Sequence, residues 1–255
     1  MDLQDAVNQL RERFLNEYQA NQSLYDERDV QRIRESDFFV ERFINFLNQG
    51  PDKGFEHMKE CYRVRKAYGM AEMSQPDFPA EVYKSGAVFP YLPDNEENIV
   101  VHIRPKICGR LKKEYGDKLE KYCMYVANQV DDSCRREFSW GLVLNAGDLS
   151  VADVDLNFVF SILPRFRKFF PNGCKYCIIF GLHWSVNAIC KMAIAAMPAD
   201  SAKKIRFYRK EQELHELIPR QHLPDYLNGS ADRDYCQFPS ISVVVELRQL
   251  SSNKQ

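Results

Sequence analysis

The sequence predicts an α/β protein in which a helical N-terminal lobe precedes a largely parallel sheet. Three segments with helical spacing come before any strand-like segment, and they predict the lobe. Two apolar runs, 140–146 and 177–180, lack the alternation of half-exposed strands and are typical of strands buried on both faces. The segment 154–170 between them has apolar residues three or four apart. A strand–helix–strand unit of this kind predicts two parallel strands.

The helical lobe is predicted over 1–75. Its first helix carries apolar residues at helical spacing from Val7 to Tyr18, and Gly50-Pro51 is expected to end the second. The residues 74–79 indicate a connector because they are rich in proline and polar side chains. The predicted helices of the lobe cover about 7–18, 37–48 and 52–69.

The second region is predicted over 76–230, with a polar tail over 231–255. Short β-rich or apolar runs predict strands, and longer amphipathic segments predict helices. Besides the unit described above, the pattern predicts strands over 87–89, 99–103 and 205–208, and helices over 111–130, 185–197 and 211–217. The tail segment 241–247 fits either an edge strand or a disordered tail.

Composition limits the class of protein. The chain has 255 residues, a net charge of −1 and 45% hydrophobic residues, so it has material for a large core and no general affinity for nucleic acid. Its first residues lack a signal peptide, and no apolar run approaches the roughly 18 residues of a membrane helix. We therefore expect a cytoplasmic protein that can associate peripherally with endomembranes.

The eight cysteines include one C-x-x-C pair, Cys174 and Cys177. Such a pair occurs in redox centres and in zinc sites. However, Cys177 falls within an apolar strand, and no second pair follows at zinc-ribbon spacing. We interpret these residues as reduced thiols in the core or at a strand entry.

No arrangement of residues predicts catalysis. The chain has no glycine-rich phosphate loop, no G-x-S-x-G elbow and no H-E-x-x-H pair. Its five histidines have no carboxylate or cysteine partner at motif spacing. Asp153 and Asp155 precede a predicted helix, where the helix dipole favours negative charge, so capping explains them. The sequence thus predicts a non-enzymatic protein without a metal site or cofactor.

Several short motifs occur in an order that matches one family. They are Arg13-Phe14 with Glu17-Tyr18, Tyr25-Asp26 with Arg28-Asp29-Val30, Arg65-Lys66, Phe158-Val159, Phe170-Pro171, Ile179-Phe180 with His183-Trp184, Asn187-Ala188 with Lys191, and Leu223-Pro224 near Gly229. With these motifs the chain resembles the CRAL-TRIO family of lipid-binding domains over residues 5–230.

The resemblance implies a mixed, largely parallel sheet covered by helices, with the sheet as the floor of an apolar pocket. One helix, here 185–197, would act as a gate. Its apolar face by itself would indicate an ordinary core helix. The floor and gate positions of the family imply a lipid pocket bordered by Leu142, Leu144, Phe158, Ile162, Phe180, Trp184, Ile189 and Met192.

The chain departs from the family at charged positions. Asn145 stands where the family often has an aspartate, and His183 replaces a common proline. The residues that hold an inositol-phosphate headgroup in the family correspond here to Asn172, Gly173, Gln212 and Leu47. Since that contact depends on charge-assisted hydrogen bonds, we expect weak or absent transfer of phosphatidylinositol. Pro164 lies inside a predicted helix, where we expect a kink.

Two functions fit these observations. The first is a carrier or sensor of a hydrophobic small molecule or phospholipid. The second is an interaction or membrane-recruitment module that keeps the fold without lipid exchange. Basic residues after the gate, above all Lys203, Lys204 and Arg206, are expected to dock transiently on an anionic membrane. Alternatively, these basic residues belong to an ordinary solvated surface, on which nearby acidic residues such as Glu211 offset their positive charge.

Overall fold

The computed structural model describes residues 2–44, 50–136, 138–153, 155–232 and 234–236, which form two compact units. A helical unit contains Met1–Ser74 and Leu163–Gly173. A sheet unit contains Gln75–Ile162 and Cys174–Gln255. The predicted division into a lobe over 1–75, a domain over 76–230 and a tail over 231–255 stays a prediction. The inclusion of Leu163–Gly173 in the helical unit is a feature that the sequence did not predict.

Among the described residues, the helical unit contains four complete helices: α1 (Leu3–Ala20), α2 (Glu27–Glu35), α3 (Asp37–Ile44) and α4 (Gly50–Ala67). The predicted spacing in α1 is confirmed, because Val7, Leu10 and Phe14 are buried in the core of this unit. The sequence missed α2, whose nine residues are mostly charged. Its start is stabilised by Asp26, whose carboxylate accepts the Arg28 N–H at 2.9 Å.

Gly50-Pro51, which was expected to end the second helix, lies at the start of the next one. Gly50-Pro51 begins α4, because a proline in the first turn of a helix does not need its missing N–H. The residues 45–48, over which that helix was expected to continue, lie outside the described residues, and so does Leu47.

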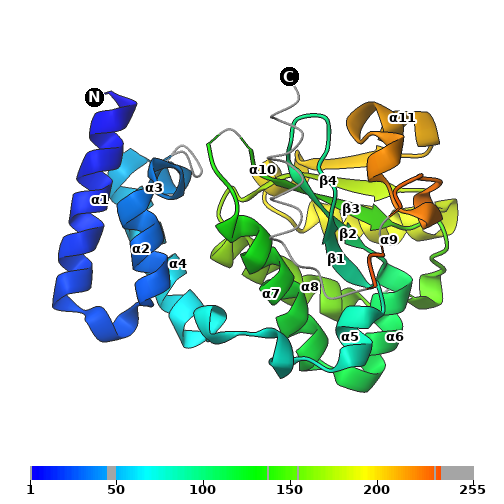
Figure 1. The fold of residues 1–255 in the computed structure, drawn as a ribbon, viewed down its shortest axis with the longest axis horizontal. Helices are drawn as coiled ribbons and strands as arrows, with labels where there is room; N and C mark the ends of the chain where they lie inside the picture. Colours follow the sequence, from blue (N-terminus) through cyan, green and yellow to red (C-terminus); the bar gives the residue numbers. More distant parts are fainter. Residues whose placement is uncertain (1, 45–49, 137, 154, 233, 237–255) are drawn as a thin grey trace. The chain divides into compact units, whose positions relative to one another are not determined.

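In the described part of the sheet unit, five strands lie in the order β1 (Val88–Tyr91), β2 (Ile99–Ile103), β3 (Trp140–Asn145), β4 (Cys174–Phe180) and β5 (Ile205–Tyr208). The pairing of β1 with β2 is antiparallel and all the others are parallel. Figure 1 shows these strands side by side with helices around them. The predicted mixed, largely parallel sheet is confirmed.

Seven helices with described residues belong wholly or partly to this unit: α5 (Ala80–Lys84), α6 (Pro105–Tyr115), α7 (Asp117–Asp132), α8 (Leu156–Phe169), α9 (Trp184–Ala195), α10 (Ala199–Ala202) and α11 (Glu211–Leu217). The single helix predicted over 111–130 is in fact two. Gly116 separates α6 from α7 with φ +51° and ψ −119°, a conformation that other residues rarely adopt. At the start of α8, Asp155 accepts the Phe158 N–H at 3.0 Å, as the capping interpretation predicted.

The crossover helices lie on one face of the sheet. The strands β2 to β5 follow in sequence order, and right-handed crossovers between such strands place α6 to α9 on the same face. The opposite face packs against α11 and the turns after it, in a core cluster that contains Val143, Ile178, Leu214 and Ile218. The segment 241–247 lies outside the described residues. Among the described helices, none is both long and apolar enough to span a bilayer.

Candidate functional site

Two cross-strand rows of apolar side chains lie on the face that carries the crossover helices. The register aligns Val101, Leu142, Cys177 and Ile205 in the first row, and Ile103, Leu144, Ile179 and Phe207 in the second. Because side chains of a strand alternate between the faces, each row points away from the α11 cluster. We call these eight residues the floor. Every one of them is apolar.

The two faces of the sheet differ in how completely they are covered. On the α11 face, Val100, Val143, Tyr176 and Ile178 are almost completely buried. On the floor, Leu142, Leu144, Cys177 and Ile205 are only half-buried, and Phe207 keeps 39% of its surface exposed. The floor thus presents apolar surface toward β5 that the protein does not fully cover.

Helix α9 is apolar on two sides. Val186 and Ala193 are buried, and Ile189 is half-buried on the same side. On the other side Trp184 is 80% exposed and Met192 58% exposed. A surface helix usually turns a polar face to solvent, whereas the outer side of α9 carries Trp184 and Met192 beside the exposed Lys191. His183 caps its start: Nδ1 accepts the Ser185 N–H at 3.4 Å and also lies 2.8 Å from the Ser185 hydroxyl.

The first half of α8 contributes Phe158 and Ile162, both half-buried. The Lys112 ammonium lies 5.4 Å from the centre of the Phe158 ring. The helix continues through Pro164, and the division between the two units falls just before this proline. The kink expected at Pro164 stays a prediction.

The predicted pocket residues therefore divide into three groups. Leu142 and Leu144 share the floor, with Phe158, Ile162 and Ile189 on helices of the same face. Phe180 lies elsewhere: it pairs with Asn145 and packs against the α11 cluster, because it is an even number of residues from Ile178. Trp184 and Met192 point outward from α9.

Sequence reasoning missed six floor residues: Val101, Ile103, Cys177, Ile179, Ile205 and Phe207. The signal that could have found them is the alternation of side chains along parallel strands in register, which selects Cys177 and Ile179 and rejects Phe180. The apolar run 177–180 concealed this alternation, because a strand buried on both faces is apolar at every position.

The predicted docking residues have different environments. Lys203 and Arg206 are exposed. Lys204 is half-buried and donates from Nζ to the Cys174 carbonyl at 2.7 Å, so it also joins β4 to the chain before β5. Arg206 aligns with Ile178 and belongs to the face opposite the floor.

The thiols of the C-x-x-C pair fit a packing role. Burial raises the pKa of Cys174 to about 12, and burial likewise raises the pKa of Cys177, so both stay protonated at neutral pH. A protonated thiol is a poor nucleophile and a poor metal ligand, because the thiolate is the reactive form. Across the described part of the chain, no cluster of three or more His, Cys, Asp or Glu side chains could hold a metal ion.

Comparison with known proteins places this geometry in context. Residues 83–229 match the family model described as CRAL/TRIO domain. The fold is also similar to the crystal structure of Sfh5, with a TM-score of 0.67 and 10% sequence identity, over 97% of this chain and 98% of that one. At this identity the likeness to Sfh5 concerns the fold alone.

Proposed function

Because the chain belongs to the CRAL/TRIO domain family, whose members generally bind and transfer small lipophilic molecules, we propose that it holds one such molecule on the floor, with α9 as the gate. The observation that carries the proposal is the contrast between the two faces of one sheet. Val100, Val143, Tyr176 and Ile178 on the α11 face are buried, whereas six of the eight apolar floor residues are half-buried or exposed. The function is non-enzymatic, as is general in the family.

The energetics favour an apolar ligand there. A ligand that removes about 200 Å² of apolar surface from water gains about 5 kcal/mol. The floor contributes only hydrocarbon and thiol side chains, and Ile162 and Ile189 add further apolar surface from α8 and α9. Such a site selects for apolar area more than for a specific charge.

A transient encounter with a membrane belongs to the proposal. The outer stripe of α9, with Trp184 and Met192, suits the boundary between lipid headgroups and acyl chains. The exposed Lys203 and Arg206 would add attraction to an anionic bilayer. We therefore propose a cytoplasmic protein that docks peripherally on membranes while the ligand exchanges.

The outward stripe also favours a second candidate, a membrane-recruitment module that keeps the fold without exchanging lipid. At a finer level, the order of the short motifs is similar to that of the CRAL-TRIO region of motile sperm domain-containing protein 2. The comparisons do not support that specific relationship, and neither proposal depends on it.

The test is native mass spectrometry and lipid extraction of the purified protein, followed by uptake of fluorescent lipids. We expect one bound lipophilic molecule per chain. Leu144→Trp should reduce uptake at least tenfold because the indole occupies the floor, and thermal unfolding measures any stability cost of the larger side chain. Leu24→Trp, the same substitution at an exposed site of the helical unit, is the matched control. A purified protein that carries and takes up no lipid would favour the recruitment module.

A further inference from the structure

The two edges of the sheet differ in how they are protected. Strands β1 and β5 stand at the two ends of the strand order. An edge strand offers unpaired N–H and C=O groups to other chains, and proteins commonly block such groups with proline or cover them. β1 contains Pro90, which has no N–H, and the Tyr122 hydroxyl donates to the Val88 carbonyl at 3.2 Å. β5 contains no proline.

The outward backbone groups of β5 belong to Ile205 and Phe207. The Tyr208 carbonyl accepts the Gly181 N–H at 2.9 Å, so the even-numbered residues of β5 face β4. Because the N–H and C=O of one residue point to the same side of a strand, those of Ile205 and Phe207 point to the outer edge. Within the described ranges of the chain, no hydrogen-bond partner lies on that side of either residue.

The side chains along this edge are accessible. Phe207 is 39% exposed and Ile205 is half-buried, both on the floor face. Arg206 is exposed on the opposite face. Residues of an added strand alternate between the same two faces. An added strand would therefore place apolar side chains beside Ile205 and Phe207, and the residue between them beside Arg206.

Four exposed cations surround the edge: Lys203, Arg206, Arg209 and Lys210. None of them forms a salt bridge with another residue that the structure describes. The nearby Glu213 carboxylate accepts the backbone N–H groups of Arg209 and Lys210, each at 2.8 Å. The excess positive charge attracts an acidic segment. It also disfavours pairing with β5 of a second copy, because that strand would bring the same cations.

We propose that the outer edge of β5 binds an extended segment of a partner protein in which acidic and apolar residues alternate. The backbone of that segment would pair with Ile205 and Phe207, and its carboxylate would meet Arg206. Lipid headgroups can meet the cations, but they do not present N–H and C=O groups at strand spacing. The open edge therefore favours a peptide. This inference goes beyond lipid binding and does not depend on it.

The experiment measures the binding of a short fluorescent peptide in which valine and glutamate alternate, by fluorescence anisotropy. Two control peptides have the same composition and charge. In one the valines and glutamates form separate blocks, and in the other every backbone nitrogen is methylated, which removes the donors. The alternating peptide should bind at least about tenfold more tightly than either control, because only it combines edge hydrogen bonds with the matching face pattern.

Variants of β5 test the two contacts separately. Phe207→Pro removes the outward N–H and leaves the ladder to β4 intact, so it should bind the peptide at least about tenfold more weakly than Phe207→Ala, which keeps that N–H. Arg206→Glu should weaken binding at least about threefold, because like charges then face each other across the strands. Arg110→Glu, at an exposed arginine of α6, should leave binding unchanged.

Thermal unfolding identifies the variants that fold, and Arg206→Glu provides the test if Phe207→Pro does not. Equal binding of all three peptides would overturn the inference and assign the cations to general attraction, such as that of the proposed membrane docking. Absence of binding at about 1 mM alternating peptide would also overturn it, as would binding that survives both β5 variants. Lipid uptake by the same protein is measured in parallel, so a failure here leaves the proposed function standing.

Discussion

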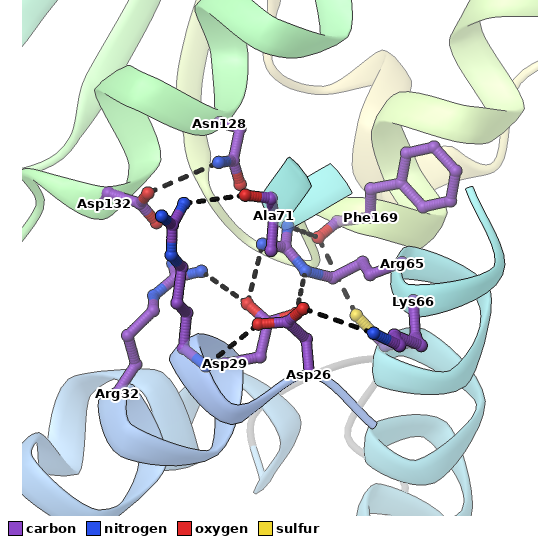
Figure 2. Close-up of polar contacts among 11 residues, drawn as sticks. Asp26, Asp29, Arg32, Arg65, Lys66, Ala71, Asn128, Asp132 and Phe169 are labelled. Carbon is purple, nitrogen blue, oxygen red and sulfur yellow. Dashed lines mark hydrogen bonds and ion pairs between the residues drawn. The ribbon is translucent and has the colours of Figure 1, made fainter. Parts of the chain in front are cut away.

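Asp29 and Arg65 form an ion pair with two hydrogen bonds inside the helical unit, in which Nε donates to Oδ2 and Nη2 to Oδ1, each at 2.8 Å (Figure 2). Both side chains are almost completely buried. Arg65 Nη1 also donates to the Phe169 carbonyl at 3.3 Å, and Arg32 Nη1 donates to Asp29 at 3.1 Å. One carboxylate on α2 therefore organises α4 and the C-terminal turn of α8.

Replacing Asp29 with alanine should destabilise the protein by about 3–5 kcal/mol, because it leaves the buried Arg65 without its counter-ion. Urea unfolding measures the change. Glu27→Ala on the same helix is the control, since its pair with Arg34 is largely exposed and should change stability by at most about 1 kcal/mol. A small effect at Asp29 would show that water or another group compensates Arg65.

Acid should destabilise the protein through His102. This residue is completely buried on β2, stacks on Phe89 at 5.3 Å, and has Nδ1 3.2 Å from the Tyr226 hydroxyl. Burial disfavours the charged imidazolium and lowers the pKa of His102 to about 3. A histidine with a lowered pKa stabilises the fold fully above its unfolded pKa of about 6.5 and loses that contribution as pH falls toward the folded value.

Between pH 6 and pH 5 we therefore expect His102 to contribute a loss of about 1 kcal/mol. His102→Phe should reduce the slope of unfolding free energy against pH in this window. Tyr226→Phe removes only the hydroxyl partner and keeps the buried imidazole, so its slope should match the wild-type slope. Identical slopes for wild-type protein and His102→Phe would contradict the assignment.

Gly141 makes room for an aromatic ring across the sheet. A Cβ at this position would lie 2.2 Å from Cε2 and Cζ of Tyr176, whose hydroxyl donates to the buried Asp94 at 2.8 Å. Gly141→Ala should destabilise the protein by about 1–3 kcal/mol, since neither the strand nor the anchored ring can move freely. Gly147→Ala, with its nearest atom at 3.5 Å, is the control.

A double-mutant cycle identifies the cause. In the background Tyr176→Val, which removes the ring, Gly141→Ala should cost much less than in the wild-type protein, and thermal or urea unfolding gives the coupling energy. Additive effects would mean that the glycine is required for another reason.

Binding to anionic vesicles should be weak, reversible and sensitive to salt. Each basic residue near the bilayer contributes about 1 kcal/mol, so changing Lys203, Lys204 and Arg206 to glutamate should lower partitioning by at least about tenfold. Lys204 also donates a hydrogen bond to the Cys174 carbonyl, so the double variant Lys203→Glu with Arg206→Glu tests the charge effect without removing that bond. Vesicle sedimentation measures the partitioning.

The apolar part of docking is tested separately. Trp184→Ala should weaken vesicle binding with little change in thermal stability, because the side chain is 80% exposed. Leu24→Ala, at an exposed apolar residue of the helical unit, should have no effect. Binding that persists at high salt after both the charge and the Trp184 changes would rule this docking surface out.

The class and order of the elements could be predicted from the chain because they depend on local periodicity. Apolar runs predicted β3 and β4. Apolar residues spaced three or four apart predicted α1, α8 and α9. Elements that depend on few residues were harder to predict. α2 has only Val30 and Ile33 as buried apolar residues, and its N-cap by Asp26 gave the stronger signal. The break at Gly116 depends on one glycine within a continuous amphipathic pattern.

The composition of the site depended on tertiary structure. The register of a strand decides which of its residues face the floor, and that register is set by pairing with strands distant in sequence. The observed register places Phe180 on the face opposite Leu144. It also adds Ile179 and Phe207 to the floor. Periodicity along a chain reflects the local preference of each segment for helix or strand. A site requires residues from several segments, and only the packing of those segments brings the residues together.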